Sequence, residues 1–96
     1  MRTAARTDAN QAEIVDALRQ IGATVQPLHQ VWRGCPDLLV GFRGVNILLE
    51  VKDGNKPPSA RKLTLHEYAW HKDWRGQVAV VNSIEDAIHV LEEQTT

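Results

Sequence analysis

Residues 45–52 form the segment that most restricts how this chain can fold. Ile47, Leu49 and Val51 recur there at every second position, which is the pattern of a β-strand with one face against a hydrophobic core. The same alternation places Glu50 and Lys52 together on the face opposite to Val51. A carboxylate and an amine that leave the end of a buried strand side by side are the first candidates for a functional site.

Other segments predict helices and strands around this one. Predicted helices cover residues 10–21, residues 63–74 and a final stretch that begins after Ser83, and further predicted strands cover residues 24–26, 38–40 and 77–81. Glycines and prolines place loops at residues 29–36 and 53–60 and a turn at residues 41–44. The order α-β-β-β-α-β-α predicts an α/β fold with a mixed central sheet flanked by helices.

Length, charge and composition restrict the class of protein. The 96 residues predict a single domain over residues 1–96, and the net charge of −1 neither requires nor excludes a nucleic-acid partner, because the basic residues crowd the middle of the chain. No apolar run approaches the roughly 20 residues of a membrane span, and residues 1–8 carry no secretory signal. Cys35 has no second cysteine to pair with. We therefore expect a cytoplasmic protein, from a bacterium or a phage-infected cell, that does not associate with membranes.

Asp37 precedes the predicted strand at residues 38–40. If that strand and residues 45–52 form an antiparallel pair, Asp37 comes beside Glu50 and Lys52 at one end of the sheet. The alternative is that Glu50 and Lys52 form an ordinary surface ion pair and that Asp37 belongs to a turn.

The chemistry of such a trio is that of metal-assisted phosphodiester hydrolysis. Two adjacent carboxylates repel each other, and a divalent cation relieves the repulsion while gaining hard oxygen ligands. Asp37, Glu50 and the carbonyl of Val51 are therefore candidate ligands for Mg²⁺ or Mn²⁺. Lys52 is expected to orient or deprotonate the attacking water, or to stabilise negative charge as it develops.

The motifs Gly34-Cys35-Pro36-Asp37-Leu38 and Glu50-Val51-Lys52 resemble the G-x-P-D-[LV]…E-V-K signature of the VRR-NUC domain family. That family belongs to the PD-(D/E)xK nuclease superfamily. The resemblance implies a restriction-endonuclease-like core and an endonuclease that cleaves DNA to leave a 5′-phosphate. It also implies that Asp37 and Glu50 bind the metal and that Lys52 is the catalytic lysine.

Two further positions are similar to the family pattern. Glu13, on the helix predicted at residues 10–21, matches an acidic residue that would contact the metal directly or through water. The segment Leu63-Thr64-Leu65-His66-Glu67 is similar to the family's Leu-Thr-x-x-Gln, with Glu67 in place of the glutamine. The resemblance does not assign a role to that glutamate.

DNA is the expected partner, and five basic side chains are expected to contact it: Arg33, Lys56, Arg61, Lys62 and His66. Trp32 has two interpretations, packing in the core or stacking on a base or ribose. Trp70 and Trp74, with Tyr68 nearby, are expected to pack on the sheet or on a partner subunit.

We expect a homodimer that acts on branched DNA such as four-way (Holliday) junctions, because stand-alone members of the family resemble junction resolvases. Two alternatives stay open. One is a catalytically weak or inactive nuclease-fold module that binds nucleic acid or protein, and the other is a monomeric nicking enzyme within a larger complex.

Overall fold

The computed structural model describes residues 8–29 and 31–96. Its elements are α1 (Gln11–Gln20), β1 (Thr24–Pro27), β2 (Leu38–Phe42), β3 (Val45–Val51), α2 (Leu65–Asp73), β4 (Val78–Val81) and α3 (Ile84–Gln94). The predicted order of helices and strands is confirmed. One turn of 3₁₀-helix, η1 (Pro58–Ala60), lies inside the predicted loop at residues 53–60. Within the described residues, no helix combines the length and the apolar character needed to cross a membrane.

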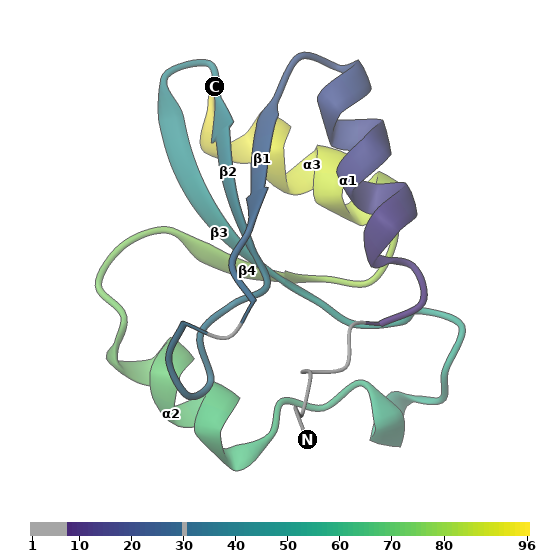
Figure 1. The fold of residues 1–96 in the computed structure, drawn as a ribbon, viewed down its shortest axis with the longest axis vertical. Coiled ribbons are helices and arrows are strands. Elements are labelled where there is room, and N and C mark those ends of the chain that lie inside the picture. Colours follow the sequence, from purple (N-terminus) through teal and green to yellow (C-terminus); the bar gives the residue numbers. More distant parts are fainter. Residues whose placement is uncertain (1–7, 30) are drawn as a thin grey trace.

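The four strands form one mixed sheet in the order β1-β2-β3-β4 (Figure 1). Neighbouring strands are antiparallel from β1 to β3, whereas β4 runs parallel to β3. The register pairs Leu38 with Leu49 and Val40 with Ile47, so the alternating apolar residues of β2 and β3 share one face of the sheet. The predicted mixed sheet is therefore confirmed.

The turn between β2 and β3 is shorter than residues 41–44. Gly41 lies inside β2 and pairs with Asn46, which leaves Arg43 and Gly44 as the two central residues of the hairpin. Both have positive φ, 52° and 80°, as the compact type I′ turn requires. The prediction was wrong at Gly41 because a glycine was taken to end a strand, whereas the two-residue turn lets the strand continue to Phe42.

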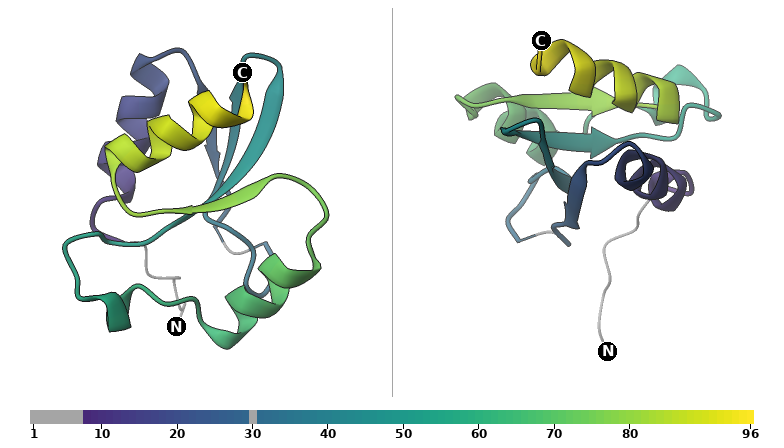
Figure 2. Two further views of the ribbon diagram at one scale, coloured as in Figure 1. Left: turned by 180° about the vertical axis from the view of Figure 1, so that it is seen from behind. Right: turned by 90° about the horizontal axis from the view of Figure 1, so that it is seen from above.

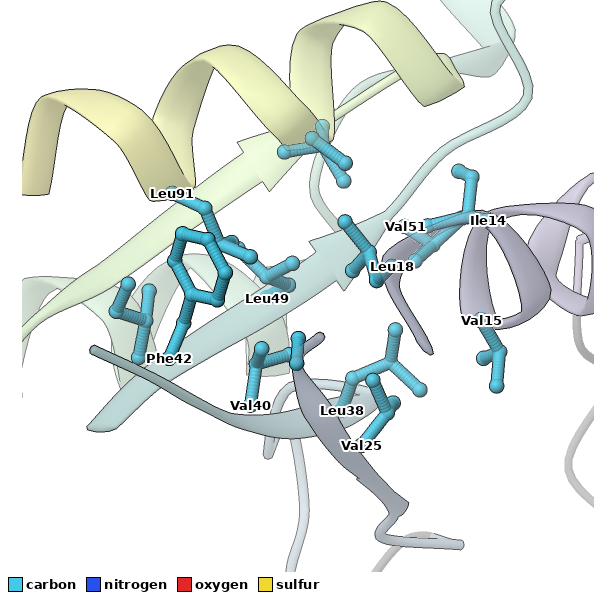
Figure 3. Packing of buried hydrophobic residues seen from close by; sticks show 14 residues of the cluster. Ile14, Val15, Leu18, Val25, Leu38, Val40, Phe42, Leu49, Val51 and Leu91 are labelled. Atoms are coloured by element: carbon cyan, nitrogen blue, oxygen red, sulfur yellow. The ribbon is translucent and has the colours of Figure 1, made fainter. Parts of the chain in front are cut away.

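Helices α1 and α3 pack against each other and cover the same face of the sheet, with α1 over β1 and α3 over β3 and β4 (Figure 2). The core between them, drawn in Figure 3, consists of Ile14, Val15, Leu18, Ala23, Val25, Leu38, Val40, Phe42, Ile47, Leu49, Val51, Val81, Ala87 and Leu91. Burial of Ile47, Leu49 and Val51 confirms the apolar face predicted for β3. Glu50 therefore faces away from this core.

Helix α2 lies apart from the other two helices, beside the loop that leads into β2 (Figure 1). None of its side chains is fully buried. Trp70 and Trp74 stack on each other, with ring centroids 4.6 Å apart, and do not join the core on the sheet. Helix α2, which buries no side chain fully, is thus the helix whose first turn faces the candidate site.

Candidate active site

Asp37 and Glu50 lie side by side at one end of the β2–β3 hairpin. The paired residues Leu38 and Leu49 are the last ones before this position, so the antiparallel register puts Asp37 opposite Glu50. The backbone N–H of Val51 donates a hydrogen bond of 2.7 Å to Asp37 Oδ2, which fixes the carboxylate against β3. The structure thus brings together the two carboxylates that the sequence singled out.

Lys52 follows directly after β3 and points to the same side as Glu50. Its Nζ lies 2.8 Å from Glu67 Oε1 and 3.7 Å from Glu50 Oε2, and its side chain is only 11% exposed. Its backbone N–H donates to the Val81 carbonyl, and its own carbonyl accepts from Asn10 Nδ2 at 3.1 Å. Contacts from α2, from β4 and from Asn10, just before α1, therefore hold this lysine in place.

Glu67 is the residue of this site to which the sequence assigned no role. Its Oε1 accepts hydrogen bonds from the Thr64 N–H at 2.9 Å and from Lys52 Nζ, while its own N–H donates to Thr64 Oγ1. These reciprocal bonds form the capping box of α2, so one carboxylate both starts the helix and binds the lysine. The pattern Thr64-x-x-Glu67 was a local signal for the capping box, but nothing local indicated the contact with Lys52.

The carboxylates of Asp37 and Glu50 have unusual titration behaviour. Burial, the negative charges of Asp37 and Glu67, and hydrogen bonding with Asp37 raise the pKa of Glu50 to about 9. Burial also raises the pKa of Asp37, although the hydrogen bond from Val51 opposes that effect. Without a cation, the pair therefore retains a proton on Glu50 at neutral pH.

The ion pair of Lys52 and Glu67 is charged. Burial opposes the charge of Lys52, but the hydrogen bond and the negative charge of Glu67 outweigh burial and raise the pKa of the lysine. Burial similarly opposes the charge of Glu67, and its bonds with Lys52 and with the Thr64 N–H lower its pKa overall. A lysine held as a cation can stabilise a developing negative charge but is a poor base, so stabilisation of charge is favoured over deprotonation of the attacking water.

These residues line a pocket of about 800 Å³ between the end of the sheet, the loop before β2 and the start of α2. The loop reaches α2 because Gly34 has a φ of +76° and because a Cβ at this position would collide with the carbonyl of His66. Close packing at Gly34 places Arg33 and His66 on the pocket wall. The glycine of the Gly34–Asp37 motif thus positions the wall that faces the carboxylates.

The structure places Glu13 away from this pocket. Glu13 lines a second pocket of about 460 Å³ together with Asp53, and none of the trio borders that pocket. The acidic residue near the start of α1 that does line the candidate site is Asp8, whose carboxylate lies 3.9 Å from Lys56 Nζ. Buried Asn10 holds this segment at the site by donating to the carbonyls of Lys52 and Asn82. These long-range bonds hold the segment that carries Asp8, and not Glu13, at the pocket.

The five basic residues that were expected to contact DNA differ in their position relative to the candidate site. Arg33 and His66 line the candidate site. Lys56 reaches its rim through the contact with Asp8. Arg61 lines the second pocket instead, and Lys62 is exposed outside both.

The donor set fits a hard divalent cation. Glu50 Oε1 is buried without a hydrogen-bond partner, next to Asp37 and the backbone of Val51. Over residues 8–29 and 31–96, no three acidic, histidine or cysteine side chains converge on a common metal position. Mg²⁺ is commonly held by only one or two carboxylates, with waters and substrate oxygens as its other ligands. Asp37 and Glu50 suit that kind of site.

Comparison of the chain with models of protein families, with curated proteins and with solved structures finds no match. The resemblance to the VRR-NUC signature is therefore a similarity of short motifs. A function for the pocket has to be derived from its geometry and charges.

Proposed function

We propose that this protein is a Mg²⁺- or Mn²⁺-dependent DNA endonuclease. The observation that carries the proposal is the adjacent carboxylates of half-buried Asp37 and buried Glu50, beside the positively charged Lys52 at one end of a hairpin. An unpaired, buried carboxylate oxygen on Glu50 is unfavourable unless a proton or a cation neutralises it. A site with these features fits metal-assisted hydrolysis better than it fits a structural ion pair.

In this proposal, Asp37, Glu50 and the Val51 carbonyl would hold the cation. A bound Mg²⁺ or Mn²⁺ would supply a water of lowered pKa and would polarise a phosphoryl oxygen. The Val51 N–H keeps Asp37 oriented, and the ammonium of Lys52 stabilises negative charge on the reacting phosphate. Glu67 positions Lys52 and limits its motion.

We propose that the α/β sheet is a restriction-endonuclease-like core of the VRR-NUC kind and that cleavage leaves a 5′-phosphate. We also propose a homodimer that acts on branched DNA, with four-way junctions as the main substrate. The competing function, a nuclease-fold module that only binds nucleic acid or protein, has no use for a charged, buried lysine between the carboxylates of Glu50 and Glu67.

The test is a nuclease assay on linear, flap, fork and four-way DNA in Mg²⁺, Mn²⁺ or EDTA. We expect cleavage of branched DNA with either metal and none in EDTA. Lys52→Ala and Asp37→Ala should reduce cleavage at least a hundredfold, the range found when one stabilising group of a polar active site is removed. Arg43→Ala, in the turn at the other end of the hairpin, is the matched control and should cleave normally. Undiminished cleavage by Lys52→Ala, or cleavage in EDTA, would contradict the proposal.

A further inference from the structure

A second hollow of about 420 Å³ adjoins the candidate active site and is lined mainly by aromatic side chains. Trp32, Arg33 and His66 border both hollows, so the two lie next to each other along the wall that these residues form. Trp70 and Trp74 add two further aromatic rings, and Ala69 and Asp73 complete the lining. We refer to Trp32, Arg33, His66, Trp70 and Trp74 together as the tryptophan pocket.

Two of the three indole rings of this pocket, those of Trp32 and Trp74, are exposed to solvent. Trp32 is 73% exposed and Trp74 is 46% exposed, so the interpretation of Trp32 as a core residue is wrong. Trp70 and Trp74 stack with an angle of 17° between their planes. Gly76 leaves room for this arrangement, because a Cβ there would lie 2.8 Å from Trp74 Nε1. Exposing such large apolar rings is costly unless a ligand covers them.

We propose that the tryptophan pocket binds one unpaired nucleobase next to the phosphate in the candidate active site. This inference deepens the proposed function and rests on it. Aromatic faces stack on any base, and the adjoining Arg33 supplies a positive charge for the linking phosphate. Because Trp32, Arg33 and His66 border both hollows, a DNA strand can reach both at once across these residues.

A second copy of this chain is a less suitable occupant. A protein surface docked on Trp32 and His66 would also cover the wall of the catalytic pocket, since both residues border it. The strongly exposed Leu65 and Tyr68 lie outside the tryptophan pocket and offer apolar surface that leaves the site open.

The test measures binding by the full-length protein in EDTA, so that cleavage plays no part. The probes are fluorescent duplexes with a single-stranded flap, either intact or with one abasic position at the branch point. We expect Trp32→Ala to weaken binding to the intact flap about tenfold, within the range known for stacking of one base on an aromatic side chain. One abasic position should weaken binding by the wild type equally, and the two losses should not add. Trp32→Phe should keep most of the affinity.

Val31→Ala, an exposed apolar side chain in the same loop, is the matched control and should bind as the wild type does. Equal weakening of intact and abasic flaps by Trp32→Ala would overturn the proposal, as would unchanged binding. A change in oligomeric state alone would also overturn it, in favour of a second copy. Base-dependent binding without cleavage in Mg²⁺ would refute the nuclease and leave the base pocket standing. If neither Trp32→Ala nor the abasic position changes the rate of cleavage, the base pocket alone would be refuted.

Discussion

Lys52 shows how much of this site depends on individual hydrogen bonds. Its ammonium binds Glu67, its N–H binds the Val81 carbonyl, and its carbonyl binds Asn10. Asp37 is held in a similar way by the Val51 N–H. Side chains restrained to this degree are preorganised, which is what stabilisation of a developing charge requires.

The raised pKa of Glu50 makes metal-free stability depend on pH. Its pKa is about 9 in the folded protein, against a usual value of 4.5, so the folded state keeps a proton that the unfolded chain releases. This contribution to the free energy of unfolding is fully present below about pH 4.5 and is lost as the pH rises towards 9. We expect thermal melts in EDTA to show falling stability from pH 5 to pH 9, and a smaller fall in Mg²⁺. An equally steep fall in Glu50→Gln would show that another group is responsible.

Glu67 has two roles that substitutions can separate. Glu67→Gln retains an oxygen for the Thr64 N–H and Lys52, so we expect α2 to remain folded and cleavage to stay within a few-fold of the wild type. Glu67→Ala removes both contacts and should slow cleavage at least tenfold. Thr64→Ala is the matched control: it costs the helix about 1 kcal/mol of capping energy but leaves the carboxylate for Lys52. Cleavage that falls as far in Thr64→Ala as in Glu67→Ala would assign Glu67 to helix capping alone.

Among the elements, α2 is held in place mostly by polar and backbone contacts. It buries no side chain fully, and its described anchors are the capping box, the ion pair with Lys52 and the close packing of Gly34 on the His66 backbone. Elements with few buried apolar contacts open at a lower free energy than the core does. The position of α2 therefore decides the shape of both hollows without contributing much to global stability.

Gly34→Ala tests this dependence. A methyl group would meet the His66 carbonyl and would force the loop away from α2, so we expect cleavage to fall at least tenfold. Gly44→Ala is a matched control, because that glycine also has a positive φ but has open space around it. Both variants should lose stability in thermal melts through the backbone conformation. Only Gly34→Ala should show faster amide hydrogen exchange in α2, and unchanged exchange there would refute the anchoring role.

At the scale of the whole molecule, the two faces of the sheet have different tasks. Helices α1 and α3 cover one face and form the core together with that face of the sheet. Asp37, Glu50 and Lys52 lie on the opposite side. The core therefore supports the hairpin without occupying the site. In the proposed function, one domain supplies one candidate active site, so cutting both strands of a junction would take two copies.

We predict that the homodimer forms through the face of α2 that carries Leu65 and Tyr68, which are 87% and 60% exposed. They are three positions apart and so lie close together on the helix surface. Leu65→Glu should convert a dimer into a monomer in sedimentation velocity at micromolar concentration and should reduce paired cutting of four-way junctions. Nicking of a flap should persist in this variant. A wild-type protein that sediments as a monomer would contradict the dimer.

Local patterns in the sequence were sufficient for the order of elements, the β2–β3 hairpin and the placement of Asp37, Glu50 and Lys52 at one end of it. These features follow from period-two alternation and short turns, which operate between neighbouring residues. Only tertiary contacts decided that Asp8 and not Glu13 lines the pocket, that Glu67 binds Lys52, and that Trp32 stays exposed. Each of these depends on bonds between segments distant in the chain, such as Asn10 with Asn82 or Gly34 with His66. No local periodicity encodes such bonds, because their partners are chosen by how the loops and α2 pack against the sheet.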